Sequence, residues 1–369
     1  MRRRIAVFVT TIQAILLAGH AFVYWTCVYF FVPMSGTSVL VLRIAFALLS
    51  ISFVTASLLA FRFSNAIVRI YYTIAAAWLG TFNFLFLASC ASWLIYGAAG
   101  LVGLNPAKRS VAFIFFLAAV VTSVVAIINA AATRVKRVRV NLDSLPAAWR
   151  GRTAALVSDV HLGHVRNLGF IRRVVIAVAH LKPDIVFITG DLYDGTAANY
   201  KTLAAPWSSI APPLGKYFVL GNHEGFTDST RYLDAVASAG IRILNKEKVE
   251  IDGLQLIGVH YHDATHAEHF RSVLEAINID RARPSILLTH APDNLAVSSA
   301  GGISLQLSGH THGGQLFPFT LFVKRMYGPF AYGLNRLGNM WAYTTSGAGT
   351  WGPPLRVGTN PEIVLIRFE

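Results

Sequence analysis

The sequence predicts two parts: an α-helical membrane domain with four spans, followed by an α/β domain whose sheets are covered by helices. Three observations support this interpretation. Apolar residues make up 54% of the 369 residues, which is too much for an ordinary soluble protein. No Asp or Glu occurs before Asp143, and long uncharged runs fill that part of the chain. After Thr153, short apolar runs alternate with amphipathic ones.

Four runs are long and apolar enough to cross a bilayer, which takes about 20 helical residues. They cover residues 5–32, 37–61, 70–96 and 111–133. The first follows Arg2 to Arg4 as a signal peptide would, but it is too long for one, so we interpret it as a retained anchor. Arg43 lies near one end of the second run, where it either reaches the interface or faces another helix. We interpret His20, inside the first run, as a packing residue.

The positive charge of the chain lies at the flanks of these runs. Residues 1–140 contain 12 Lys and Arg and no acidic residue, so they carry +12 of the overall +14. Only Lys108 and Arg109 fall on the side opposite to the other flanking clusters. The positive-inside rule therefore predicts a multi-pass protein of the cell (inner) membrane, with the N-terminus and everything after Arg134 in the cytoplasm. Because the charge follows membrane topology, we expect no nucleic-acid partner.

The predicted domain boundaries follow from changes in charge and in the pattern of apolar residues along the chain. Residues 1–140 form the membrane domain with its basic flanks, residues 141–152 a linker, and residues 153–369 the α/β domain. Strands are predicted at residues 154–157, 185–189, 217–220, 254–259, 286–288, 305–307, 341–345 and 363–366, and helical spacing at 170–181, 228–238 and 267–279. The two cysteines, Cys27 and Cys90, lie in the apolar part and lack the spacing of a metal site.

Five polar clusters each follow one of the predicted strands directly. They are Asp159-Val-His161, Gly190-Asp191-Leu-Tyr-Asp194, Gly221-Asn222-His223-Glu224, Thr289-His290 and Gly309-His310-Thr-His312. Ligands of α/β sheets gather at the carboxyl ends of strands, so the five clusters are expected to meet at one site. Carboxylates, imidazoles and an amide without any thiolate suit manganese, iron or zinc. Two such ions about 3.5–4 Å apart can hold a hydroxide at neutral pH, the nucleophile that phosphate-ester hydrolysis needs.

In this order and spacing, the five motifs resemble the calcineurin-like metallophosphoesterase superfamily over residues 153–369. The run from Gly309 to Gln315 and the ending Gly349-Thr-Trp-Gly-Pro-Pro-Leu-Arg-Val-Gly further resemble its membrane-associated bacterial branch with N-terminal transmembrane helices. The resemblance implies a four-layer αββα sandwich. It also implies a binuclear centre with two divalent metal ions per chain, manganese foremost and iron or zinc as alternatives.

The resemblance also implies the roles of individual residues. Asp159, His161 and His312 would bind one metal, Asn222, His290 and His310 the other, and Asp191 would bridge them. His223 would protonate the leaving oxygen or stabilise developing charge, with Glu224 or Asp194 available to orient it. A structural turn role for Asp194 is an equal alternative. Structural roles are the default for His164, expected in an exposed loop, and for His260 and His262.

An apolar stretch at residues 316–332 follows the last motif. It holds Leu316, Phe317, Phe319, Leu321, Phe322, Met326, Tyr327, Phe330 and Tyr332, with Lys324 and Arg325 between them. Such a segment either enters the membrane interface to reach a lipid substrate or packs over the sheet, and packing is slightly favoured.

The expected activity is metal-dependent hydrolysis of a phosphodiester or pyrophosphate bond by a hydroxide that bridges the metals. The expected partners are a phosphoester substrate, preferably lipid-linked, and the lipid bilayer. Analogy and location suggest UDP-diacylglucosamine or another phospholipid. The competing function is a membrane transporter or signalling scaffold whose metal domain is sensory. Against it, the membrane part offers only Arg43 and His20 as polar candidates, too few for an obvious translocation path.

Overall fold

The computed structural model describes residues 2–225 and 229–369, and the chain divides into two compact units. The first unit comprises Met1–Ile128 with Gly352–Leu355, and the second comprises Asn129–Trp351 with Arg356–Glu369. Four long helices account for the first: α1 (Arg2–Phe30), α2 (Gly36–Ala60), α3 (Ala66–Leu101) and α4 (Lys108–Ala131). By length and composition, all four are able to cross a membrane. The prediction of four apolar helices is therefore confirmed.

Polar side chains within these helices are used locally. The side chains of Ser35 and Asn65 cap α2 and α3 by accepting main-chain N–H groups. Nδ1 of His20 lies 2.7 Å from the carbonyl of Leu16, and its Nε2 accepts from the Trp78 indole at 3.0 Å. Both ring nitrogens are thus satisfied, as the packing interpretation of this histidine requires.

Arg43 of α2 donates from Nε to the hydroxyl of Tyr24 on α1 at 3.2 Å. Of the two alternatives for this arginine, the structure therefore shows a partner on a neighbouring helix.

Two six-stranded sheets form the second unit. The first has the order β1-β12-β2-β3-β4-β5 and the second the order β10-β11-β9-β8-β7-β6. The strands of the first are β1 (Arg134–Val140), β2 (Thr153–Val157), β3 (Ile185–Thr189), β4 (Lys216–Val219), β5 (Arg242–Ile243) and β12 (Glu362–Phe368). Those of the second are β6 (Glu247–Ile251), β7 (Leu254–Gly258), β8 (Ser285–Leu288), β9 (Leu305–Ser308), β10 (Gly333–Leu337) and β11 (Met340–Thr344). In each sheet the central strands that carry the site run parallel: β2, β3 and β4, and β7, β8 and β9.

The two sheets pack face to face, and alternation along β2 shows how. Ala154 and Leu156 enter the core between the sheets, whereas Ala155 and Val157 pack against the helices outside. The register places Leu156 opposite Phe187 of β3 and Val364 of β12, which also belong to the inner core.

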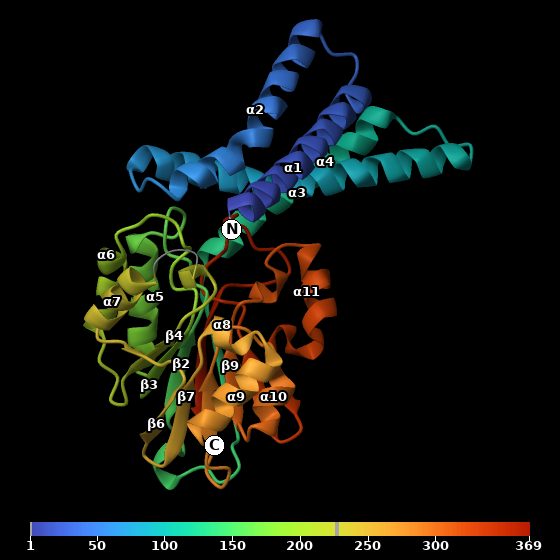
Figure 1. Ribbon diagram of the computed structural model, residues 1–369. Helices are drawn as coiled ribbons and strands as arrows, with labels where there is room; N and C mark the ends of the chain where they lie inside the picture. Colours follow the sequence, from blue (N-terminus) through green and yellow to red (C-terminus); the bar gives the residue numbers. More distant parts are fainter. Residues whose placement is uncertain (1, 226–228) are drawn as a thin grey trace. The chain divides into compact units, whose positions relative to one another are not determined.

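Helices cover both outer faces of the sandwich (Figure 1). The first sheet carries α5 (Leu168–Leu181), α6 (Tyr200–Ala204) and α7 (Thr230–Ser238), and the second carries α8 (Tyr261–Ala264), α9 (Ala267–Ile277) and α10 (Leu295–Ala300). Short 3-10 helices occupy Ala147–Trp149, Ala205–Ser209, His223–Gly225, His312–Gly314 and Gly328–Ala331. This arrangement confirms the four-layer αββα sandwich.

Three elements differ from the sequence-based expectations. Strand β1 occupies residues that we assigned to a basic flank. These residues form a strand because Val138 and Val140 point into the inner core while charged residues alternate with them. Trp149, assigned to a linker, is fully buried and donates to the carbonyl of Ile251 at 2.8 Å. The apolar stretch 316–332 contains a helix, α11 (Phe319–Tyr327). The first residue of the helix expected at 228–238 lies outside the described residues.

Candidate metal centre

The five polar clusters lie in loops that follow β2, β3, β4, β8 and β9. Main-chain hydrogen bonds tie these loops together. The Asp159 N–H donates to the carbonyl of Gly190 at 3.1 Å, and the Gly309 N–H donates to that of His290 at 2.7 Å. The site therefore lies where the strand ends of both sheets meet, as expected for an α/β architecture.

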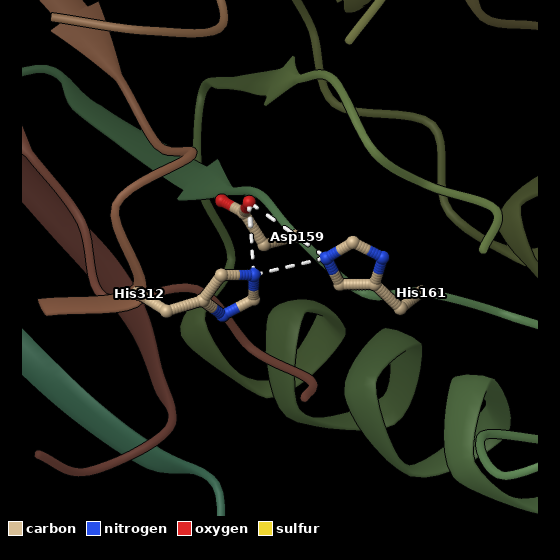
Figure 2. Close-up of side chains that lie close together, drawn as sticks. All are labelled: Asp159, His161 and His312. Carbon is tan, nitrogen blue, oxygen red and sulfur yellow. Dashed lines mark hydrogen bonds and ion pairs between the residues drawn. The ribbon is translucent and has the colours of Figure 1, made fainter. Parts of the chain in front are cut away.

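One group of side chains consists of Asp159, His161 and His312, all buried (Figure 2). The Nε2 atoms of His161 and His312 lie 3.0 Å apart. The Oδ1 atom of Asp159 lies 3.9 Å from the first of these nitrogens and 3.4 Å from the second. One carboxylate and two imidazoles thus converge on one point, an arrangement that could hold a metal ion.

A second group consists of Asn222, His290 and His310. The Oδ1 atom of Asn222 lies 3.1 Å from Nε2 of His290 and 3.0 Å from Nδ1 of His310. These two imidazole nitrogens are 3.2 Å apart. Nδ1 of His290 lies 2.8 Å from the carbonyl of Thr189, which can only accept, so Nε2 remains available as a ligand.

Asp191 lies between the two groups. Its Oδ2 atom is 3.2 Å from Nε2 of His290 and 3.8 Å from Nε2 of His161. Its other oxygen accepts the main-chain N–H of His223 at 2.9 Å. A single buried carboxylate therefore faces both groups of ligands.

The backbone at the site is held in an unfavourable conformation. Left-handed φ angles occur at Asp159 (51°), His161 (53°), Asp191 (49°), His310 (69°) and His312 (49°). Each costs about 1–3 kcal/mol for a residue other than glycine, and such residues concentrate at functional sites. Two glycines permit the close approach of these loops, because a Cβ at Gly221 would collide with Asp191 and one at Gly309 with Asp159.

Burial and mutual attraction shift the pKa values of these groups. Burial raises the pKa of Asp159 to about 6. Burial lowers the pKa of His310 to about 4, and those of His161 and His312 fall well below the usual value. These three imidazoles are therefore neutral near pH 7, the form that binds a metal.

Asp191 and His290 behave as an ion pair. Burial alone would raise the pKa of Asp191, but attraction to His290 holds it well below the usual range. Burial alone would lower the pKa of His290, but Asp191 raises it to about 10. A proton on His290 therefore neutralises the carboxylate of Asp191.

The donor set fits divalent metal ions. The neutral imidazoles of His161 and His312 lie within hydrogen-bonding distance of each other, but two neutral imidazoles share at most one proton at their contact. Nδ1 of His161 is buried and has no hydrogen-bond partner among the described residues. The contacts between the side chains satisfy only some of the lone pairs that converge at the two groups. A cation at each group would accept the remaining lone pairs.

The three residues proposed for catalysis occupy different positions. The ring of His223 reaches the candidate ligands, with Nε2 3.9 Å from Asp191 Oδ2. The expectation that a side chain of Glu224 or Asp194 orients it is not met. Instead, Nδ1 of His223 lies 2.9 Å from the main-chain oxygen of Asp194.

The two carboxylates hold the loops. Glu224 is fully buried and accepts the main-chain N–H groups of Asp191 at 3.0 Å, Tyr193 at 3.1 Å and Gly221 at 2.8 Å. Burial raises the pKa of Glu224 to about 7, and repulsion by the Asp191 carboxylate contributes to this increase. Oδ1 of Asp194 accepts from the N–H of Thr196 at 2.8 Å and from its hydroxyl at 2.5 Å. Asp194 thus has a structural turn role as well as supplying its carbonyl.

His164 is not in an exposed loop as expected. It is 4% exposed, and its Nδ1 lies 2.9 Å from the Thr196 hydroxyl. His260 and His262 flank Tyr261, whose ring centroid lies 5.3 Å from that of His310. His262 also packs against Gly225, next to Glu224.

The sequence reasoning missed Arg356, a buried arginine beneath His312. Its guanidinium donates to the carbonyls of Ser346 at 2.7 Å, Gly349 at 2.6 Å and His312 at 3.1 Å. Burial lowers its pKa to about 9, so it stays charged near neutral pH. The available signal was its position as the only charged residue of the run Gly349–Gly358.

Comparisons with known proteins agree with this geometry. Residues 153–314 match the calcineurin-like phosphoesterase family. An "Uncharacterized metallophosphoesterase" of Aquifex aeolicus is 34% identical over 243 residues, covering 64% of this chain and 92% of that protein. A "Transmembrane protein with metallophosphoesterase domain" of Danio rerio is 35% identical over 269 residues, covering 68% of this chain but only 61% of that protein. The metallophosphoesterase YkuE of Bacillus subtilis is 28% identical over 248 residues, covering 61% of this chain and 82% of that protein.

The sandwich, the loops at its strand ends and the groups that could hold a metal ion define the second unit as a metallophosphoesterase domain. The chain belongs to the calcineurin-like phosphoesterase family.

Proposed function

We propose that this protein hydrolyses a phosphodiester or pyrophosphate bond of a membrane-associated substrate at a two-metal site. The main support for this proposal is the position of Asp191, whose Oδ2 lies 3.2 Å from Nε2 of His290 and 3.8 Å from Nε2 of His161. Asp159, His161 and His312 would hold one ion, and Asn222, His290 and His310 the other. Divalent ions, manganese foremost, would supply a nucleophile at neutral pH by lowering the pKa of a coordinated water.

The residues of the chain would do the remaining work. Asp191 keeps both groups of ligands in register. His223 presents Nε2 to the side of Asp191 that faces the ligands, where a proton on that atom could pass to the leaving oxygen. The carbonyl of Asp194 fixes the ring of His223 in this orientation.

The substrate assignment rests on the membrane part of the chain. Four apolar helices tether the hydrolase domain to a bilayer, which favours a phosphoester carried by a lipid. UDP-diacylglucosamine is the first candidate by analogy, and other phospholipids follow. The excess of Lys and Arg at the proposed inner flanks supports an inner-membrane protein with a cytoplasmic hydrolase domain.

The test is to purify the full chain in detergent, measure its metal content and assay phosphomonoesters, phosphodiesters and UDP-lipids. The wild type is expected to bind two ions and to hydrolyse at least one diester or pyrophosphate. Asp191→Ala is expected to lose hydrolysis, whereas Asp234→Ala, which removes an exposed carboxylate on α7, retains it. Retained hydrolysis in Asp191→Ala would contradict the proposal. Absence of both metal and turnover from the wild type would favour the transporter or scaffold alternative.

A further inference from the structure

Helix α11 presents an apolar face that the rest of the described chain leaves uncovered. None of its nine residues is buried. Phe319, Phe322 and Met326 are 51%, 64% and 73% exposed, and their spacing of three and seven residues places them on one side of the helix. The expectation that the stretch 316–332 packs over the sheet therefore fails for α11, whereas Leu316 is buried and Phe330 packs against the core of the second sheet. A contiguous apolar surface of this kind marks an interaction site.

The opposite side of α11 is attached to the metal-site loops. Thr320 packs directly against Gly314, two residues after His312. Tyr327, at the other end of the helix, is hydrogen-bonded to Asp293, three residues after His290. The helix is therefore fixed at both ends to loops that carry candidate ligands, and its apolar face points away from them.

The same helix lies beside the point where the chain leaves α4. The last turn of α4 belongs to the α/β unit, and Asn129 in that turn donates to the carbonyl of Thr359 at 2.9 Å. The preceding residue, Gly358, lies against Thr320 of α11. Downstream, Lys136 of β1 donates to the hydroxyl of Tyr332 at 3.0 Å. Asn129 is thus bonded to the residue that follows Gly358, and Lys136 is bonded to Tyr332, five residues after the end of α11.

We propose that α11 lies in the interface of the bilayer that α1 to α4 cross, with Phe319, Phe322 and Met326 in the apolar layer. Arg325 is exposed at one edge of this face, where it can meet acidic headgroups, whereas Lys324 is exposed on another side of the helix. Because α1 to α4 anchor the chain in the same bilayer, the contact of α11 with the bilayer is effectively intramolecular. Even a short helix can therefore stay bound to the interface. A second copy of the chain is the competing occupant. Arg325 favours the bilayer, because in such a dimer this charge would lie at the edge of the interface beside the same charge of the second copy.

This inference deepens the proposed function and rests on it for its consequence. With α11 in the interface, the loops of His290 and His312 are held close to the headgroup region, where a lipid phosphoester presents its reactive bond. The favoured substrate class is therefore a phospholipid taken from the bilayer surface.

The test uses the full chain in single-copy nanodiscs that contain acidic lipid, with Cys27→Ser and Cys90→Ser as background. A nitroxide is attached through Met326→Cys, and its accessibilities to oxygen and to a water-soluble nickel chelate are measured by power-saturation EPR. Ile176→Cys is the matched control, because Ile176 on α5 is another exposed apolar residue, at 54%. The oxygen-to-nickel ratio is expected to be higher at 326 than at 176. Equal ratios, or a site at 326 closed to both reagents, as in a protein interface, would overturn the proposal.

A second measurement addresses substrate capture. Phe322→Ser combined with Met326→Ser is expected to lower hydrolysis of a phosphoester lipid in vesicles relative to soluble bis(p-nitrophenyl) phosphate. Ile176→Ser should leave that ratio unchanged. An unchanged ratio in the double variant would overturn the role in substrate capture. Absence of all hydrolysis from the wild type would contradict the proposed function, while the EPR result would still decide the membrane contact.

Discussion

The Nδ1 atom of His223 lies 2.9 Å from the main-chain oxygen of Asp194, and this contact turns Nε2 of the same ring towards Asp191. A carbonyl can only accept, so Nδ1 must carry a proton. The ring therefore presents Nε2 to the candidate metal centre in one fixed orientation. That geometry suits proton transfer to a leaving group.

We expect His223→Ala to slow hydrolysis by about 10²–10⁴-fold for esters with poor leaving groups. The loss should be much smaller for p-nitrophenyl esters, whose leaving oxygen needs little protonation. The measurement is kcat/KM across a series of leaving-group pKa values, with metal content determined in parallel. An equal loss across the series would show that His223 does not act as the acid.

Asp194→Asn and Asp194→Ala separate the side chain from the carbonyl. Asn retains the acceptor for both bonds from Thr196, whereas Ala removes it. We therefore expect Asp194→Ala to lower the free energy of unfolding by about 1–3 kcal/mol, and Asp194→Asn to leave it nearly unchanged. Both variants keep the carbonyl that orients His223. A large loss of kcat in a stable Asp194→Asn protein would contradict the structural role of this carboxylate.

Glu224→Gln tests the clamp on the loops. Both oxygens of Glu224 accept from main-chain N–H groups, and an amide NH₂ in place of either one would face a donor. We expect destabilisation of about 1–3 kcal/mol and weaker metal binding. Chemical denaturation and metal titration measure the two effects. Wild-type values for both would show that the clamp is dispensable.

Arg356→Leu would leave the carbonyls of Ser346, Gly349 and His312 without their buried donor. The expected cost is at least about 3 kcal/mol of unfolding free energy, together with loss of the metal ion next to His312. Arg231→Leu, on the exposed side of α7, is the matched control and should be neutral. Full metal occupancy in Arg356→Leu would show that the arginine does not position His312.

Metal uptake should release protons. Attraction to Asp191 raises the pKa of His290 to about 10, so its ring is protonated at pH 7.5 and must lose that proton to bind a metal. The apparent affinity should rise about tenfold per pH unit below pH 10, and more steeply below about pH 6, where Asp159 is also protonated. Calorimetry in buffers of different ionisation enthalpy counts the protons. Release of fewer than one proton at pH 7.5 would contradict this assignment.

Much of the fold could be predicted from periodicity. The four apolar helices and strands such as β2 and β3 are defined by local patterns that tertiary contacts do not override. Strand β1 was not predicted because its Arg and Lys residues were assigned to the flank of a membrane helix. These charges obscured the alternation that turns Val138 and Val140 inward. Helix α11 was missed as a helix because its apolar residues, read only as a composition, suggested burial in the core.

The site could be predicted as a set of residues but not as a set of contacts. Asp159, Asp191 and His290 stand out because each follows a strand in a polar cluster. Arg356 acts on His312 across 44 residues of sequence, and no local pattern encodes such a contact. In the same way, the family resemblance implies that Asp194 can orient His223 but not that its carbonyl, rather than its carboxylate, makes the contact.

The most direct measurement is an anomalous difference map from a crystal of the manganese-loaded protein. Two peaks about 3.5–4 Å apart are expected. One should contact Asp159, His161 and His312, the other Asn222, His290 and His310, and Asp191 should touch both. A single peak, or two peaks that do not share Asp191, would contradict the central claim.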